Sequence, residues 1–359
     1  MLRRPDTDRW ALISLTSKIA AAGPIAPHAH PTMQTRLLGT ARLPVSAIAL
    51  GHSMGANDFS ASGQKVFNDL IDQALALGVN FLDSSDAYWN GLHESWLRQA
   101  LGARRHQVVL TSKFGNITLP DGSKATDARP AYVQACCEAS LKRLGTDHID
   151  LYYLHRVDPK VPIEDTLGAM ARLVDQGKVR YLGICEAGVA TIERAHRVHP
   201  LTAVQSEYSL WCREVEAAVL PACRRLGIGF VGYSPLGRGL LTGDIQSYDD
   251  LAPHDRRRIH PRFKGDNLAR NLALVAEMGR LAHDLGLSNA QLALAWSLSK
   301  GDDMVPVTGT QRVAYLAQSV AAERTRLTPA QQAQLETIFS PQAVAGERYP
   351  VEMLSGVGI

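Results

Sequence analysis

The chain has 359 residues, of which 45% are hydrophobic and 20% are charged, a composition typical of a globular protein. Its net charge is +3 at pH 7 and the two signs are interspersed, so we expect no nucleic-acid partner. No apolar run approaches the ~20 residues that a membrane-spanning helix requires, and we therefore expect no membrane association.

Residues 1–32 differ in composition from the rest of the chain. They carry Arg3 and Arg4 near their start and end in a stretch rich in Pro and His. A secretory signal needs an uninterrupted apolar centre, and here Asp6, Asp8 and Lys18 intrude. We interpret residues 1–32 as a disordered extension, with the folded part beginning at Met33; a weak targeting peptide is the alternative.

Eight short apolar runs, rich in β-branched residues, recur along the chain and are the candidate strands. Each is continuous and bounded by Gly, Asp or Ser, which is typical of strands buried on both faces. They span residues 47–50, 79–82, 108–111, 149–154, 179–184, 203–205, 228–233 and 304–307.

Most of these runs are followed by a segment with helical periodicity. Residues 66–77, 132–144 and 163–174 are amphipathic, and a glycine lies at or near the end of each, as expected for a helix C-cap. Right-handed crossovers between parallel strands place every helix outside the sheet. The pattern therefore predicts a single α/β domain over residues 33–350, a (β/α)8 TIM barrel.

Two further helical patterns exceed the eight units. Residues 267–285 form an extra helix inserted before the seventh barrel helix at 289–298, and residues 329–339 form a C-terminal helix. We expect 351–359 to be a C-terminal tail. The loop 237–266 is long, basic and punctuated by Pro and Gly, which favours a functional loop.

Five cysteines form an odd set without a C-x-x-C spacing. We read them as small buried residues of a reduced, cytoplasmic protein. His196 and His199 lie three positions apart, but no further ligand completes a set near them, and we expect no metal site.

Polar residues at the carboxyl ends of three successive strands are the candidate catalytic groups. Asp83 and Tyr88 follow the second strand, Lys113 follows the third and His155 the fourth. In a parallel barrel these ends share one mouth. An ammonium beside a tyrosine lowers its pKa from ~10 and makes it a better proton donor.

In this interpretation Asp83 pairs with Lys113, and His155 orients a carbonyl oxygen. A cofactor must supply the hydride, because no side chain can. Each of these residues also has a purely structural interpretation. In it, Asp83 caps a loop, Lys113 is an ion-pair partner and His155 is a buried histidine. An aldolase-type barrel with Lys113 as a Schiff-base lysine fits poorly, because Asp83 would keep the amine protonated.

Six motifs in the sequence resemble those of a known enzyme family. They are "FLDSSDAYWNG", "TSKFG", "DLYYLHRVD", "VQSEYSLW", "YSPLGRGLLTG" and "VPVTGTQ". Over about residues 33–350 the chain resembles an aldo-keto reductase, most closely the bacterial and fungal branch with pyridoxal-reductase-like and general aldehyde-reducing members. The resemblance implies that Asp83, Tyr88, Lys113 and His155 are the catalytic tetrad. It also implies NADPH-dependent reduction of an aldehyde or ketone, with Tyr88 as proton donor.

A second interpretation is a cofactor-binding regulatory subunit, since the same fold resembles potassium-channel β-subunits. For either, we expect a small-molecule carbonyl ligand and a monomer or weak homo-oligomer. Multiple turnover of a simple aldehyde would distinguish the two.

A dinucleotide-binding G-x-G-x-x-G is absent from the sequence, so the barrel itself must hold the cofactor. The resemblance implies that the cofactor lies across the barrel mouth, with the loop 237–266 over it. Arg238 and Arg262 are then phosphate contacts or, alternatively, loop charges facing solvent. The other residues that the resemblance places at the cofactor are Cys185, Glu186, Gln205, Tyr233, Ser234, Leu236, Gly237, Gly309, Gln311, Arg312, Gln318 and Ser319.

Several of these positions depart from the family pattern. Cys185 stands where Ser is usual, and a thiol is a weaker donor than a hydroxyl. Gln318 and Ser319 stand where Glu and Asn are usual, and Gln311 where a cation is common. Because Arg312 remains to bind a 2′-phosphate, we expect NADPH to be preferred.

Trp89 follows Tyr88 at a position where the family favours glycine. With Trp211, Phe59 and Met54 it predicts an aromatic wall over the carbonyl site, and thus a preference for flat hydrophobic aldehydes. Packing inside the fold is the alternative role for these side chains.

Overall fold

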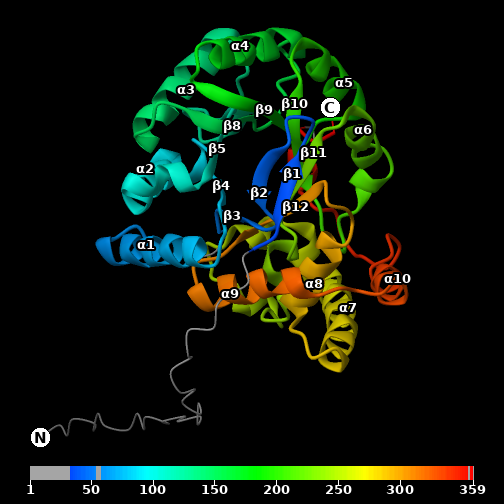
Figure 1. Ribbon diagram of the computed structural model, residues 1–359. Helices are drawn as coiled ribbons and strands as arrows, with labels where there is room; N and C mark the ends of the chain where they lie inside the picture. The colour runs from blue at the N-terminus through cyan, green and yellow to red at the C-terminus, as the bar shows by residue number, and fades with distance from the viewer. Residues whose placement is uncertain (1–32, 54–57, 355, 359) are drawn as a thin grey trace, which may run out of the picture. The chain divides into compact units, whose positions relative to one another are not determined.

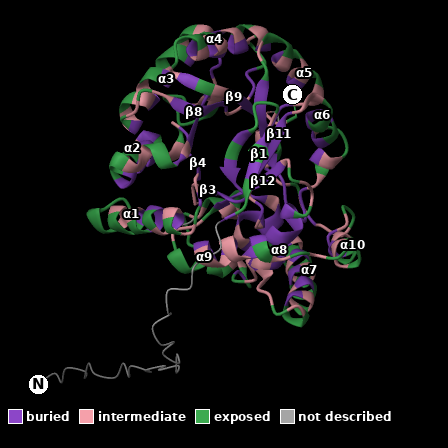
Figure 2. Cartoon of the chain, viewed as in Figure 1, coloured by how far each residue is buried: buried purple, intermediate pink, exposed green. Residues whose placement is uncertain are grey.

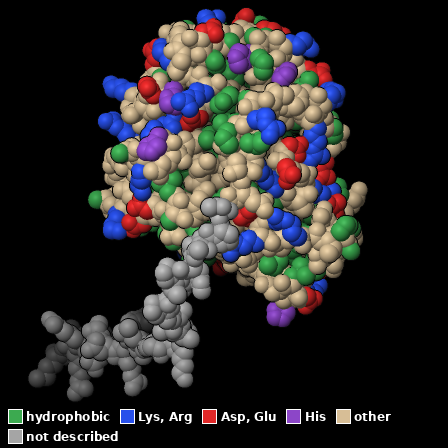
Figure 3. Space-filling model, viewed as in Figure 1, with side chains coloured by type: hydrophobic (Ala, Val, Ile, Leu, Met, Phe, Trp, Pro, Cys, Tyr) green, Lys and Arg blue, Asp and Glu red, His purple; other side chains and the backbone are tan. Residues whose placement is uncertain are grey.

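The computed structural model of the chain describes residues 33–53, 58–354 and 356–358. The predictions made for residues 1–32 and for Met54 lie outside these residues. None of the described helices is both long and apolar enough to cross a membrane. On the face shown in Figure 3, basic and acidic side chains are interspersed.

Eight parallel strands close into a barrel, which confirms the predicted TIM-barrel fold (Figure 1). The strands follow one another around the barrel in chain order, and the last pairs with the first. Each of the eight predicted runs falls on one of them. They are β3 (Ala49–Gly51), β4 (Phe81–Asp83), β5 (Val109–Phe114), β8 (Ile149–Leu154), β9 (Val179–Cys185), β10 (Leu201–Glu207), β11 (Gly229–Tyr233) and β12 (Met304–Gly309).

A helix follows each barrel strand and packs on the outside of the barrel. Figure 2 shows the strands buried and the outward faces of the helices exposed, as the alternating apolar periodicity predicts. These helices are α1 (Ala61–Ala76), α2 (Leu92–Leu101), α3 (Pro130–Leu144), α4 (Ile163–Asp175), α5 (Val189–Val198), α6 (Val219–Leu226), α8 (Asn289–Leu298) and α9 (Val313–Ala321).

The two predicted extra helices are present, and one of them explains an oddity of its neighbour. α7 (Gly265–Asp284) precedes α8, and α10 (Pro329–Ile338) follows the barrel, with the short α11 (Val351–Leu354) after it. In α8 all residues except Asn289 and Gln291 are buried. A helix that is apolar all round needs cover on its outer side, and α7 packs against it there.

Two small antiparallel hairpins were not predicted from the sequence. β6 (Asn116–Thr118) pairs with β7 (Lys124–Thr126) in the loop after β5. β1 (Thr35–Leu38) pairs with β2 (Leu43–Ser46) ahead of the barrel. Strands of three or four residues carry too little periodicity to be distinguished from loops.

The β1–β2 hairpin closes the amino-terminal end of the barrel. Leu38, Leu43 and Val45 are buried and belong to the same hydrophobic cluster as the residues that fill the barrel interior. At the turn, Gly39 has a φ of 63°, and a Cβ there would lie 2.6 Å from the carbonyl oxygen of Thr202. Glycine is required at this point because it alone fits both the left-handed backbone and the close approach.

The hairpin gives a matched pair of stability variants. Leu38 is fully buried, whereas its neighbour Leu37 is 39% exposed. We expect Leu38→Ala to lower the free energy of unfolding by about 2–5 kcal/mol, because it opens a cavity at the base of the barrel. Leu37→Ala is the control and should change it little. Urea denaturation followed by circular dichroism measures both, and equal effects would contradict the closure role of the hairpin.

Candidate active site

The carboxyl ends of β4, β5 and β8 bring the four predicted catalytic side chains together. Lys113 is fully buried at the end of β5. Its Nζ donates to Asp83 Oδ2 at 2.5 Å, to the carbonyl oxygen of Ser84 at 2.9 Å and to the hydroxyl of Tyr88 at 3.2 Å. All three ammonium hydrogens therefore have an acceptor, so the charge and the position of Lys113 are both fixed.

Asp83 is held from both sides of the barrel. Its Oδ1 accepts a hydrogen bond from Thr111 Oγ1 at 3.0 Å and another from Gln205 Nε2 at 2.9 Å. Gln205 reaches Asp83 from β10, on a different part of the barrel wall. One of its two amide hydrogens is thus used within the fold, and the amide oxygen is an acceptor for the predicted cofactor contact.

The predicted lowering of the pKa of Tyr88 is wrong. Burial of the hydroxyl raises its pKa, and this effect exceeds the opposing effect of the Lys113 ammonium, which lies 4.9 Å from the ring centroid. Burial disfavours the charged phenolate, and its extent could not be read from the sequence. Tyr88 is therefore fully protonated at neutral pH, in the form that can donate a proton.

His155 is held through a contact that the sequence analysis missed. Its Nδ1 lies 3.1 Å from Ser85 Oγ, and its ring meets that of Tyr88 edge-on at 5.8 Å. Burial, together with the positive charges of Lys113 and Arg156, holds the pKa of His155 well below its usual range. The imidazole is therefore neutral at physiological pH.

His52 is a second side chain at this site that the sequence analysis missed. It follows β3, and its ring stacks on that of Tyr88 with centroids 4.8 Å apart. Burial, with the charge of Lys113, lowers its pKa to about 4. The sequence contained a signal for His52, because it lies at the end of the first strand just as Lys113 lies at the end of the third.

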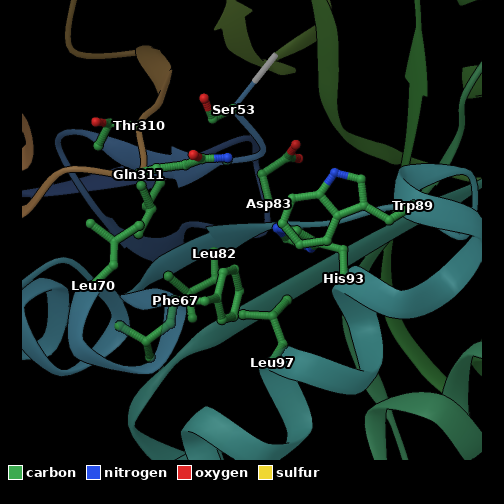
Figure 4. Close-up of a pocket in the computed structure, with 13 residues that line it drawn as sticks. Ser53, Phe67, Leu70, Leu82, Asp83, Trp89, His93, Leu97, Thr310 and Gln311 are labelled. Atoms are coloured by element: carbon green, nitrogen blue, oxygen red, sulfur yellow. The ribbon is translucent and has the colours of Figure 1, made fainter. Parts of the chain in front are cut away.

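Trp89 and Asn90 turn the chain sharply after Tyr88. Both have left-handed backbone angles, with φ of 52° and 53°, which non-glycine residues rarely adopt. The turn directs the Trp89 ring toward Phe59 and Phe67, at centroid distances of 5.5 and 6.2 Å. Trp89 also lines a pocket that it shares with Asp83 (Figure 4).

That pocket lies between the ends of the first two barrel strands and the helices that follow them. Apolar side chains from β3, β4, α1 and α2, together with Trp89, form most of its wall, and Figure 4 shows Phe67, Leu70 and Leu97 opposite polar groups. The polar groups come from β4, from α2 and from the loops after β3 and β12. They are Asp83, His93, Ser53, Thr310 and Gln311.

Trp211 does not join Trp89 in the predicted aromatic wall. It is buried, and its ring packs against Phe339, at a centroid distance of 6.4 Å, and against the backbone of Gly237. A Cβ at Gly237 would come within 2.3 Å of the indole. Trp211 therefore packs under the loop after β11 and supports it, and is not part of the wall predicted beside Trp89.

Buried ion pairs join the ends of β9, β10 and β11 to the C-terminal segment. Arg348 binds both oxygens of Glu186, at 3.0 and 2.8 Å, and Arg238 binds Glu207 at 2.7 Å. The hydroxyl of Tyr233 lies 2.7 Å from Glu186 Oε1. Glu207 and Arg348 were not singled out from the sequence, because nothing local to either residue indicates its partner.

These contacts place the two predicted phosphate-binding arginines inside the fold. The side chain of Arg238 is 3% exposed in its ion pair with Glu207. Arg262 is also buried, donates from Nε to the carbonyl oxygen of Gly346 at 3.2 Å and lies 5.6 Å from the Trp211 ring. Both link the loop after β11 to the rest of the mouth, so neither is a loop charge facing solvent.

The loop after β11 has the backbone geometry of an anion-binding turn. Ser234, Gly237, Arg238 and Gly239 all have positive φ, from 53° to 94°. Turns with left-handed residues can form concavities of backbone N–H groups that suit phosphate. Here the N–H groups of Gly237 and Gly239 donate to the carbonyl oxygens of Ser234 and Leu236, both at 2.9 Å, so a phosphate would bind other N–H groups of the turn. Leu236, which is partly buried, lies within this turn. The backbone conformation of this turn is compatible with the predicted contact to a pyrophosphate.

The remaining predicted cofactor residues lie along two edges of the mouth. Cys185 is buried at the end of β9, and burial raises the pKa of its thiol to about 12. At the end of β12, a Cβ at Gly309 would lie 2.2 Å from the carbonyl oxygen of His52. Ser319 is buried and Gln318 partly buried, both on α9.

Arg312 is exposed beside the loop after β11. Its Nη1 donates to the hydroxyl of Tyr315 at 2.9 Å, and that hydroxyl donates to Asp244 at 3.2 Å. Tyr315 belongs to α9 and Asp244 to the loop after β11, so the chain of bonds joins these two segments. Arg312 is accessible to a ligand from solvent, as a contact to a 2′-phosphate requires.

Comparison with known proteins identifies relatives of the whole barrel. The model of the "Aldo/keto reductase family" matches residues 47–339. Similar solved structures include the glycerol dehydrogenase of Gluconobacter oxydans, with 25% identity, a TM-score of 0.76, and 86% of this chain and 96% of that chain covered. An aldo-keto reductase of Bacillus halodurans in its holo form has 26% identity, a TM-score of 0.71, and 86% and 97% covered. A thermostable aldo-keto reductase in complex with the inhibitor epalrestat has 26% identity, a TM-score of 0.68, and 85% and 100% covered.

The buried pair of Asp83 and Lys113 can be tested by a double-mutant cycle. We expect Lys113→Met to lower the free energy of unfolding by about 3–5 kcal/mol, because it leaves the Asp83 carboxylate buried without its counter-ion. The double variant Asp83→Asn, Lys113→Met should recover part of this loss. Lys65→Met, which breaks the exposed pair with Asp69, is the control and should change stability little. Additive effects of the two substitutions in urea denaturation would contradict the coupling.

Proposed function

This chain belongs to the aldo/keto reductase family, and on that premise we propose that it reduces aldehydes or ketones to alcohols with NADPH. Tyr88 donates the proton to the carbonyl oxygen. The observation that carries the proposal is the position of Lys113, whose Nζ lies 2.5 Å from Asp83 Oδ2 and 3.2 Å from the Tyr88 hydroxyl. Members of this family use nicotinamide cofactors, and the cofactor supplies the hydride when it is bound.

Tyr88 is suited to proton donation because its oxygen is neutral before the reaction and becomes negative beside Lys113 in the transition state. Before reaction it is protonated, because burial raises its pKa. As its proton leaves, negative charge develops on the oxygen, 3.2 Å from the Lys113 ammonium. Asp83 keeps that ammonium charged, and so the ammonium stabilises a charge that exists only as the reaction proceeds.

His155 positions the carbonyl oxygen beside Tyr88. Its Nδ1 lies against Ser85 at 3.1 Å, so Nε2 is the nitrogen that remains for the substrate. A neutral imidazole that carries its hydrogen on Nε2 donates a hydrogen bond to the carbonyl oxygen without adding a positive charge near Lys113. The geometry supports a two-donor site for one oxygen atom.

The cofactor would be held along the mouth by groups from β9 to β12. The Tyr233 ring would stack on the nicotinamide, and the Gln205 amide oxygen would accept from its carboxamide. The turn from Ser234 to Gly239 would hold the pyrophosphate, and Arg312 would hold the 2′-phosphate. Arg312 supports NADPH over NADH, since a guanidinium binds phosphate through two hydrogen bonds.

The surroundings of the site suggest the class of substrate and the compartment. Phe59 is 56% exposed and packs edge-on against Trp89, which supports flat hydrophobic aldehydes as substrates. The five cysteines, all within the described residues, are free, and this supports a reducing compartment such as the cytoplasm.

Tyr88→Phe tests the proposed proton donor. We expect it to lower kcat/KM for aldehyde reduction by about 10²-fold or more, since it removes the general acid and keeps the ring. NADPH oxidation over a panel of aldehydes, ketones and pyridoxal measures the loss, and Tyr181→Phe, near the start of β9 and away from the barrel mouth, is the matched control. Multiple turnover in the parent, and turnover slower by about 10²-fold or more in Tyr88→Phe, is the expected result. A Tyr88→Phe variant with unchanged kcat/KM would rule out the role of Tyr88.

Arg312→Leu tests the proposed cofactor preference. We expect kcat/KM with NADPH to fall about tenfold to a hundredfold, because a hydrogen-bonded charge pair to the 2′-phosphate is lost. With NADH, which lacks that phosphate, the value should stay the same. Arg270→Leu, at an exposed position on α7, is the control. A parent enzyme that prefers NADH would refute the assignment.

A further inference from the structure

Ser85 contacts His155 from the loop that follows β4. It lies two residues after Asp83, is fully buried and places Oγ 3.1 Å from Nδ1 of His155. Three more groups surround the same oxygen. They are the backbone N–H of Ala87 at 3.2 Å, Oδ1 of Asp86 at 3.3 Å and the carbonyl oxygen of Lys113 at 3.4 Å.

The Ser85 hydroxyl has a single hydrogen, and this limits which of these hydrogen bonds can exist at the same time. A serine hydroxyl donates one hydrogen bond and accepts two. The N–H of Ala87 occupies one acceptor position. The single hydroxyl hydrogen must therefore go to one of three acceptors, namely His155 Nδ1, Asp86 Oδ1 or the Lys113 carbonyl oxygen.

The direction of that hydrogen determines which nitrogen of His155 is protonated. His155 is neutral, because burial and the nearby positive charges hold its pKa well below its usual range. A neutral imidazole carries one hydrogen. If Ser85 donates to Nδ1, the hydrogen of the ring lies on Nε2. If Ser85 donates elsewhere, Nδ1 must donate to Ser85, and Nε2 has only a lone pair.

Asp86 is the neighbour whose charge can change the direction. As a carboxylate, it attracts the hydroxyl hydrogen of Ser85. As a carboxylic acid, it can donate its own hydrogen to Oγ and fill the second acceptor position, so the hydroxyl hydrogen turns to His155. Burial, followed by the negative charge of Glu94, raises the pKa of Asp86 to about 6, so both forms occur near neutral pH.

The charged and titratable groups facing Asp86 come from three elements. Glu94 on α2 is buried and binds Arg143 on α3 at 2.5 Å, and these two act on Asp86 with opposite signs. The remaining groups are neutral near pH 6, because burial raises the pKa of each. They are Tyr132 and Cys136 on α3 and Tyr152 on β8.

We propose that Ser85 and Asp86 are positioning residues, and that together they set the tautomer of His155. When Asp86 is ionised, His155 carries its hydrogen on Nδ1. When Asp86 takes up one proton, the ring hydrogen exchanges through solvent to Nε2, so the net change is one proton gained. Only the second state offers a donor to the carbonyl oxygen of the substrate.

This inference rests on the proposed function, since it gives His155 the role of hydrogen-bond donor in carbonyl reduction. A donor on Nε2 lowers the energy of the developing alkoxide, whereas a lone pair there repels it. Reduction should therefore be faster below pH 6 than above it. A hydrogen bond of this kind corresponds to about a tenfold change in kcat.

The tautomer can be observed without catalysis. Two-bond proton–nitrogen correlation spectra of protein labelled with ¹⁵N in the histidine rings distinguish the protonated from the unprotonated nitrogen, and comparison with His155→Gln assigns the signals. We expect His155 to change from the Nε2–H to the Nδ1–H form as pH rises from 5 to 7.5, with a midpoint near 6. A single tautomer across this range in the parent protein would overturn the proposal.

Variants separate the two positioning residues from general effects on folding. Asp86→Asn is close in shape and cannot ionise, so the tautomer should stop changing with pH and the pH step in kcat should disappear. Ser85→Ala should abolish both effects although Asp86 still titrates, and Ser85→Thr, which restores a hydroxyl, should recover them. An unchanged step in Asp86→Asn would refute the role of Asp86.

The kinetic and spectroscopic measurements can refute the proposed function and the hydrogen-bond relay separately. If no aldehyde is reduced but the tautomer changes as expected, the proposed function is wrong and the hydrogen-bond relay stands. If aldehydes are reduced, with kcat independent of pH between 5 and 7.5 and KM alone affected in Ser85→Ala, the proposed function stands and the relay is wrong.

Discussion

The fully buried ammonium of Lys113 is the constraint on which the mouth of this barrel depends. A charge without contact to water is tolerated only when it is paired and all its hydrogens are bonded. Here the partners come from β4, from the residue that follows it and from the turn beyond. Gln205 and Thr111 then hold Asp83 from β10 and β5. The ion pair of Lys113 and Asp83, with the hydrogen bonds to it, thus links β4 and β5 to β10, which is distant in sequence.

Much of the fold could be predicted because its signals are local. Continuous apolar runs indicated the eight strands, and helical periodicity with glycine ends indicated the helices between them. The four side chains at the strand ends could be grouped because a parallel barrel brings those ends together. The extra helix α7 followed from the same periodicity.

What the sequence could not provide depends on distance and burial. Glu186 and Arg348 are 162 positions apart, and Glu207 and Arg238 are 31 apart, so no local pattern indicates either pair. The expected effect of Lys113 on Tyr88 had the right sign, but burial outweighs it, and burial is known only from the structure. Trp211 was grouped with Trp89 by residue type, although Gly237 packs against its ring.

The C-terminal segment has a consequence for the order of events during synthesis. Glu186 and Glu207 lie at the ends of β9 and β10, and the arginine that binds both Glu186 oxygens is Arg348, which is made 162 residues after Glu186. Until that residue leaves the ribosome, the Glu186 carboxylate lacks this cation, and full burial would be unfavourable. The barrel wall can form as the chain emerges, but its mouth is completed only after Arg348 has emerged as well. A growing chain that has not yet reached Arg348 would therefore hold much of its barrel wall before it holds the finished mouth.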